Sequence, residues 1–161
     1  MDSVEYNKCV NNYADSVYRF ILKNIGDREK ARDIVQDSFM RMWERSADIT
    51  SDKAKSYLFT TAYHTMIDMI RKDKRITAAD DTHMNNLVTF NSYNDLQEVL
   101  NRALDTLPEI QKVVITLRDY EGYSYEEIGN ITNLTESQVK VYIYRGRVAL
   151  KTYLGSIERV I

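Results

Sequence analysis

Ser124 to Lys151 reads SYEEIGNITNLTESQVKVYIYRGRVALK, which contains two helical patterns separated by a short polar turn. Each pattern begins with a capping box, a Ser or Thr followed three residues later by Glu or Gln. The two boxes are Ser124 with Glu127 and Thr135 with Gln138. Between them lies Asn133, one of the few non-glycine residue types that tolerate a left-handed backbone. The stretch therefore predicts two helices joined by a tight turn.

The second helix of this pair is expected to have one buried side and one exposed side. Apolar or small residues recur at helical spacing at Val139, Ile143, Gly146 and Leu150. The other sides carry Gln138, Lys140, Tyr144, Arg145 and Arg147. This pattern is typical of a helix-turn-helix whose second helix enters the DNA major groove. An amphipathic helix pair with no role in DNA binding is the alternative interpretation.

The distribution of charge favours the DNA-binding interpretation. The segment from Gln138 to Lys151 has a net charge of +4 and contains no acid, whereas the segment from Asp105 to Glu127 has a net charge of −4. A merely solvated surface would mix its signs. The segregation suits a basic helix that faces phosphates, with an acidic side held away from them or placed against a basic protein.

Composition narrows the possible classes of protein. The chain has 161 residues, a net charge of −2 and 43% apolar residues, enough for one domain or two small ones. A general DNA-coating protein is excluded by this charge. The single cysteine, Cys9, excludes an internal disulfide and fits a reducing cytoplasm, and no apolar run is long enough to insert into a membrane. Without metal-ligand spacing, a glycine-rich phosphate loop or a nucleophile–base pair, we expect no metal, no cofactor and no enzymatic activity.

The remaining sequence is predicted to be almost entirely helical. The chain has one proline and five glycines, so little interrupts helix formation. Helices are expected from Val4 to Ile25, from Asp27 to Arg45 and from Asp52 to Lys74, with Pro108 in the first turn of a later helix.

Domain boundaries are indicated by a change in composition. Residues 76–95 are rich in Asn, Asp, Thr and Ser and show little helical periodicity, so they are expected to form a linker. The predicted fold is all-α, with two small helical domains, 1–75 and 96–161, joined by this flexible linker, and the second domain contains the helix-turn-helix.

A second nucleic-acid surface is predicted on the helix from Asp52 to Lys74. The net charge from Lys53 to Arg75 is +4. Hydroxyls, an imidazole and cations on one helix face can donate hydrogen bonds to phosphates and base edges. The polar face consists of Tyr57, Thr60, Thr61, His64, Asp68 and Arg71.

The preceding helix offers a different kind of face. Asp33, Gln36 and Asp37 are expected to be exposed near two aromatic residues, Phe39 and Trp43. Acids beside aromatic anchors suggest a protein-binding surface. The alternative is that both aromatics belong to the core and that the acids are only solvated.

Three motifs of this chain resemble those of bacterial RNA polymerase sigma factors. The resemblance to the helix that binds core polymerase lies in ARDIVQDSFMRMWE (Ala31 to Glu44). The second motif, SYLFTTAYHTMIDMIRKDKR (Ser56 to Arg75), resembles the helix that reads and opens the minus-ten promoter element. The third motif resembles the domain that reads the minus-thirty-five element. It consists of LDTLPEIQKVVITLRDYEGYSYEEIG (Leu104 to Gly129) and the following QVKVYIYRGR. Their order and the short length are similar to the extracytoplasmic function subgroup of the sigma-70 family.

The resemblance implies partners and roles for particular residues. The partners are core RNA polymerase, promoter DNA and an anti-sigma factor. It assigns docking on polymerase to Asp33, Gln36, Asp37 and Phe39. It assigns the opened minus-ten strand to Tyr57, Thr60, Thr61, His64 and Arg71, and a flipped base to the loop from Ser46 to Lys53. It assigns the minus-thirty-five element to Gln138, Lys140, Val141, Tyr144 and Arg145.

Two other classes of protein remain as alternatives. A stand-alone helix-turn-helix regulator would bind duplex DNA by itself, as a dimer on a palindrome. The acidic and aromatic residues near Asp33 and the basic helix ending at Arg75 argue against it. A small helical enzyme is disfavoured because both histidines are isolated in the sequence.

Overall fold

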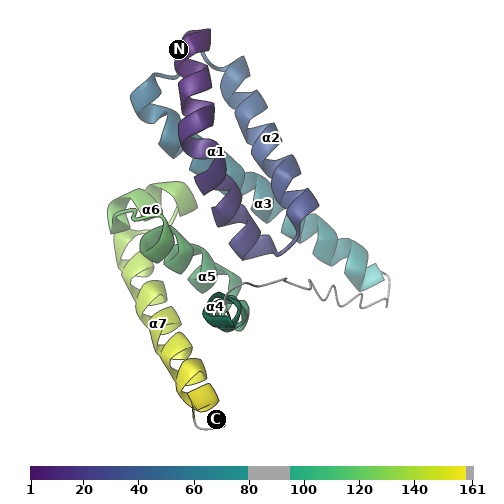
Figure 1. Cartoon of the computed structure of the whole chain (residues 1–161), viewed down its shortest axis with the longest axis vertical. Helices are drawn as coiled ribbons and strands as arrows, with labels where there is room; N and C mark the ends of the chain where they lie inside the picture. The colour runs from purple at the N-terminus through teal and green to yellow at the C-terminus, as the bar shows by residue number, and fades with distance from the viewer. Residues whose placement is uncertain (80–94, 159–161) are drawn as a thin grey trace. The chain divides into compact units, whose positions relative to one another are not determined.

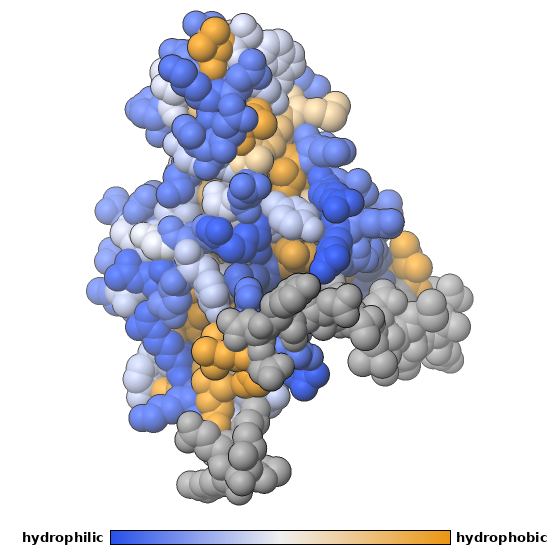
Figure 2. Space-filling model, viewed as in Figure 1, coloured by the Kyte–Doolittle hydropathy of each residue, from blue (hydrophilic) through white to orange (hydrophobic). Residues whose placement is uncertain are grey.

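The computed structural model describes residues 1–79 and 95–158, and every regular element in these ranges is a helix (Figure 1). The all-α prediction is confirmed. The described residues divide into two compact units, one before and one after the segment 80–94. Hydrophilic residues cover most of the surface visible in Figure 2. None of the described helices is both long enough and apolar enough to cross a bilayer.

Three long helices make the first unit. They are α1 (Ser3–Ile25), α2 (Arg28–Glu44) and α3 (Ala54–Ala79), and each packs against the other two. A short 3₁₀ turn, η1 (Ser51–Lys53), leads into α3. The rings of Phe20 and Phe59 meet at 5.6 Å in the core. Other fully buried side chains in this unit include Val17, Ile21, Ile34, Met42, Leu58 and Met66.

The corner between α1 and α2 is fixed by two adjacent residues. Gly26 adopts a left-handed backbone with φ of 71°, and its N–H donates to the carbonyl of Leu22 at 2.8 Å. Glycine adopts this conformation without a steric penalty. The next residue, Asp27, caps α2 by accepting a hydrogen bond from the N–H of Lys30 at 3.1 Å. The predicted end of the first helix at Gly26 is therefore confirmed.

The end of α3 differs from the prediction. The helix was expected to stop near Lys74, but it continues to Ala79 and crosses the predicted boundary of the linker. Residues 76–79 contain no glycine or proline and end in two alanines, the best helix former, so nothing local stops the helix. The rest of the predicted linker, residues 80–94, lies outside the described residues.

The second unit is built around a short buried helix. Its elements are α4 (Asp95–Asp105), α5 (Glu109–Ile115), the π-helical turn η2 (Thr116–Tyr120), α6 (Tyr125–Thr132) and α7 (Glu136–Glu158). The buried residues of α5 and η2 form one continuous run from Lys112 to Leu117. Ile115 packs with Leu104 and Leu107 and against partly buried Ala149 and Leu150.

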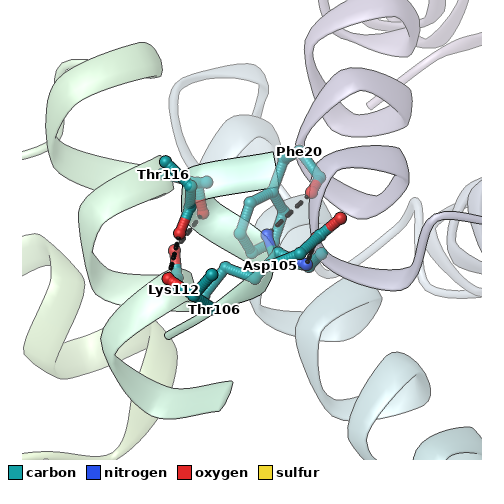
Figure 3. A network of polar contacts seen from close by, with 7 residues as sticks. Phe20, Asp105, Thr106, Lys112 and Thr116 are labelled. Carbon is teal, nitrogen blue, oxygen red and sulfur yellow. Dashed lines mark hydrogen bonds and ion pairs between the residues drawn. The ribbon is translucent and has the colours of Figure 1, made fainter. Parts of the chain in front are cut away.

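The buried run includes two polar side chains, and both form hydrogen bonds. The ammonium of Lys112 reaches Asp105 at 2.6 Å, and the hydroxyl of Thr116 donates to the carbonyl of Lys112 at 2.9 Å (Figure 3). Pro108 precedes α5 as its N-cap residue, one position before the first turn in which it was expected. Its ψ of 147° is extended, so helical geometry begins only at Glu109.

The helix-turn-helix forms as the sequence predicts. Both capping boxes are present: the N–H of Glu127 donates to the Ser124 hydroxyl at 3.1 Å, and that of Gln138 donates to the Thr135 hydroxyl at 3.1 Å. Asn133 takes the left-handed conformation, with φ of 62° and ψ of 33°. Val139 and Ile143 are buried, as expected for the inward side of α7.

A glycine sets the distance between α5 and α7. A Cβ atom placed on Gly146 would overlap with Cδ1 of Ile115 and would lie 3.5 Å from Cβ of Gln111. A side chain at position 146 would therefore require the end of the Ile115 side chain to move. This contact fixes α7 against the rest of the second unit.

We predict that Gly146→Ala lowers the free energy of unfolding of the second unit by about 1–3 kcal/mol, because overpacking forces Ile115 to shift. Ile115→Val removes Cδ1 and should recover part of this loss in the double variant. Gly155→Ala is the control. Gly155 lies on the same helix, and a Cβ added there would meet no atom within 4 Å. Urea unfolding followed by circular dichroism measures the effect. Equal stability of the two alanine variants would contradict the close-approach argument.

Candidate nucleic-acid interface

The outer face of α2 carries the acidic residues predicted to dock on a protein. Asp33 and Gln36 are exposed. Asp37 is partly exposed, and its carboxylate forms an ion pair with Nε of Arg41 at 3.0 Å. Residues at these spacings share one side of a helix. The structure therefore brings these three residues to one surface.

Phe39 and Trp43 have different environments, which the sequence left open. Phe39 is only 7% exposed, whereas Trp43 is 50% exposed. Tyr6 of α1 contacts both residues: its hydroxyl donates to the carbonyl of Phe39 at 2.9 Å, and its ring packs edge-on against both aromatic rings. Phe39 thus offers little surface to a partner. The exposed apolar side chains of α2 are Trp43 and Met40.

A polar hollow lies between the end of α2 and the first half of α3. Its volume is about 450 Å³. Four of the five residues predicted to contact the minus-ten strand line it, while Arg71 lies farther along α3 and is exposed. The complete lining is Arg41, Glu44, Arg45, Tyr57, Thr60, Thr61 and His64. The three residues from the end of α2 were missed by sequence analysis, because periodicity within one helix does not reveal what another helix brings beside it.

The chemistry of the hollow suits an unpaired nucleic-acid strand. Tyr57 and His64 provide aromatic rings on which bases can stack, and the Thr60 and Thr61 hydroxyls can donate to phosphates. His64 is exposed and rests edge-on against Tyr63, with ring centroids 5.2 Å apart. Within the described ranges no group of three His, Cys, Asp or Glu residues is placed to hold a metal ion.

The second surface is the exposed side of the first half of α7. All five residues predicted to face the minus-thirty-five element are exposed, and Tyr144, at 71%, is the most exposed of the large hydrophobic side chains that the structure describes. The set is Gln138, Lys140, Val141, Tyr144 and Arg145. Gln138 also serves the helix start, since its amide oxygen accepts the N–H of Thr135 at 2.9 Å. Its amide NH₂ group remains available to an acceptor.

The cations on α7 differ in their pairing. Arg147 binds Asp119 of η2 at 2.6 Å, which raises the pKa of the guanidinium above its ordinary value. Lys140 lies 3.8 Å from Glu136. Within residues 1–79 and 95–158, no salt bridge joins Arg145 to a carboxylate. The predicted separation of acidic and basic segments is therefore incomplete, and Arg145 is the basic residue of this face most available to DNA.

A basic cluster beside α7 was not identified from the sequence. The guanidinium of Arg118 lies 4.9 Å from the centre of the Tyr125 ring, and the ammonium of Lys140 lies 5.9 Å from it. Arg118 also donates to the carbonyl of Tyr123 at 2.9 Å. The π-helical turn brings Arg118 to the start of α6, an irregularity that a 3.6-residue period cannot reveal. These cations extend the basic surface of α7 towards the first helix of the pair.

Comparison with known proteins agrees with this geometry. Residues 9–76 match the family described as Sigma-70 region 2, and residues 97–150 match Sigma-70, region 4. The chain is similar to the ECF RNA polymerase sigma factor SigM of Bacillus subtilis, with 31% identity over 86% of this chain and 88% of that one. It is also similar to the RNA polymerase sigma factor SigV of Bacillus subtilis, with 29% identity over 91% and 89% of the two chains.

Solved structures share the fold. The sigma factor RpoE of Bartonella quintana, crystallised with the anti-sigma factor NepR, superposes with a TM-score of 0.81 at 23% identity, over 93% of this chain and 96% of that one. CnrH, solved in complex with the cytosolic domain of CnrY, gives a TM-score of 0.69 at 21% identity, over 94% and 88% of the two chains. On the family matches and the similarity to SigM, this chain belongs to the extracytoplasmic function group of the sigma-70 family of RNA polymerase sigma factors.

Proposed function

We propose that the chain binds core RNA polymerase through the outer face of α2 and directs it to promoters through two DNA-contacting surfaces. The hollow between α2 and α3 holds the opened strand of the minus-ten element. The exposed side of α7 reads the minus-thirty-five duplex. The observation that carries this proposal is the assembly of Tyr57, Thr60, Thr61 and His64 with two arginines around one hollow.

The two surfaces belong to separate domains in this proposal. Residues 1–75 act as sigma region 2, residues 96–161 as region 4, and residues 76–95 join them. The family matches at 9–76 and 97–150 support this division. Neither surface needs to bind DNA tightly alone, because polymerase holds both and raises the effective concentration of the second contact. The net charge of −2 limits binding of the free protein to chromosomal DNA.

The proposal includes regulation by an anti-sigma factor. Two proteins with this fold, RpoE and CnrH, were solved with NepR and with the cytosolic domain of CnrY, respectively. A protein that works on bacterial polymerase acts in the cytoplasm. A stand-alone helix-turn-helix regulator is not favoured, because such a protein has no need for region 2.

Reconstitution with bacterial core polymerase tests the proposed function. We expect the purified chain to form a stable complex with core enzyme, and the complex to make discrete new transcripts from a fragmented genomic template. Alignment of their start sites should yield two conserved upstream elements. Tight binding of the free protein to duplex DNA, without association with core enzyme, would instead establish a stand-alone regulator.

Two arginines of α7 provide a matched test of duplex recognition. Arg145→Ala should lower the affinity of the holoenzyme for its promoter about tenfold, because this guanidinium is available to bases and phosphates. Arg147→Ala should have a smaller effect on affinity, since Arg147 is held by Asp119. Promoter binding by fluorescence anisotropy at fixed salt measures both. If Arg147→Ala caused the larger loss, the assignment of the DNA-facing side of α7 would be wrong.

Charge reversal tests docking on polymerase. Asp37→Arg should weaken association with core enzyme by about tenfold or more, because it places a cation beside Arg41 on the proposed contact face. The exposed Asp15 of α1 gives a control, since Asp15→Arg makes the same change of charge outside this face. Competition for labelled core enzyme measures affinity, and circular dichroism checks helicity. Normal docking by Asp37→Arg would place the interface elsewhere.

A further inference from the structure

Glu44 is an anomaly in the hollow between α2 and α3. It is the last residue of α2, where the helix dipole disfavours a negative charge, and it lines a site that otherwise contains cations, hydroxyls and aromatic rings. Arg41 lines the same hollow but is bound to Asp37 at 3.0 Å. In the described part of the chain, no salt bridge joins Glu44 to a cation. The position of this carboxylate is therefore not explained by helix stability or by pairing within the protein.

Glu44 also argues against a hollow that binds only phosphates. A carboxylate beside a phosphate is repulsive, and it would cancel part of the attraction of Arg45 and Arg41 for the strand. An ionised carboxylate only accepts hydrogen bonds, so it needs a neutral or cationic donor. An opened DNA strand provides such donors only on its bases, because its phosphates are acceptors. The carboxylate and the arginines therefore suit different parts of one nucleotide.

The family resemblance already implies an unpaired base here, held by the loop from Ser46 to Lys53 between the two helices. We propose that Glu44, which lines the adjacent hollow, selects a base bearing an amino group at this position. The inference rests on the proposed function and deepens it. The volume of about 450 Å³ falls in the range of sites that enclose a small molecule. Tyr57 and His64 stack on the base, Arg45 faces the adjacent phosphate, and the Glu44 carboxylate accepts from the Watson–Crick edge.

The chemistry of unpaired bases sets the expected preference. Guanine offers an N–H and an amino group side by side, which a carboxylate can accept together. Cytosine and adenine each offer an amino group, as they do to carboxylates and amides in duplex DNA. Thymine has no amino group, and its one N–H donor lies between two carbonyl oxygens, which the carboxylate would repel. The hollow should therefore reject thymine at one position of the minus-ten element.

Transcription from a promoter library tests the inference with the complete holoenzyme. The library randomises each position of the minus-ten element in a template whose strands are mismatched there, so that base selection is measured without the cost of melting. With the wild-type chain we expect one position from which thymine is depleted. Glu44→Gln places an amide donor in the same space, and it should admit thymine at that position about tenfold more often.

Two further variants separate base selection from changes in charge or folding. Glu29→Gln removes an exposed carboxylate from the first turn of α2 and should leave all base preferences unchanged. Glu44→Ala should weaken the preference against thymine without creating the gain seen with Gln. Circular dichroism confirms that each variant is helical.

The outcomes distinguish this inference from the proposed function. If the wild-type holoenzyme makes no promoter-specific transcripts, the proposed function itself fails. If it transcribes but tolerates thymine at every position, or if Glu44→Gln leaves the preferences unchanged, only the role of Glu44 is overturned. Depletion of thymine that Glu44→Gln reverses and Glu29→Gln leaves unchanged supports the inference.

Discussion

The exposed surface of α7 depends on the packing of this helix against α5, where Gly146 lies against Ile115. Because Gly146 has no side chain, α7 lies directly on the buried run of α5, and Ile115 fills the space between them with Leu104 and Leu107. With α7 in this position, Val139 and Ile143 are buried on its inward side, and the opposite side of the helix is exposed. On the proposed function this exposed side reads bases, and a surface that reads bases must be held rigidly, which the packing of α7 on α5 provides.

In the first unit, several contacts together hold the hollow in place. No single contact positions the hollow; two helices converge on it after a corner fixed by Gly26 and Asp27. Lys30 near the start of α2 forms an ion pair with Asp73 near the end of α3 at 2.7 Å. This pair joins the two helices at the ends that lie away from the hollow. Tyr6 of α1 secures the other half of α2 through the carbonyl of Phe39. The lining residues therefore stand on helices that are held on both sides of the site.

Local rules predicted the features that local interactions decide. The turn at Asn133, the capping boxes and the break at Gly26 depend on a few adjacent residues, and the sequence indicated all of them. The end of α3 was missed because nothing in residues 76–79 stops a helix. The environments of Phe39 and Trp43 depend on Tyr6, which is more than thirty positions away. Likewise, most of one helix face of the hollow was predicted, whereas the residues from the end of α2 were not, because pairing of helices is a property of the fold.

Cations on both proposed DNA surfaces are partly neutralised within the protein. Arg41 binds Asp37, Lys140 approaches Glu136 and Arg147 binds Asp119. A phosphate must compete with these carboxylates, so the pairs weaken attraction to any DNA, whatever its sequence. On the proposed function, contacts with bases would not be reduced in the same way, since Arg145 has no salt bridge within residues 1–79 and 95–158. On the proposed function, this arrangement trades affinity of the free protein for discrimination, and polymerase restores the affinity by holding both surfaces on one promoter.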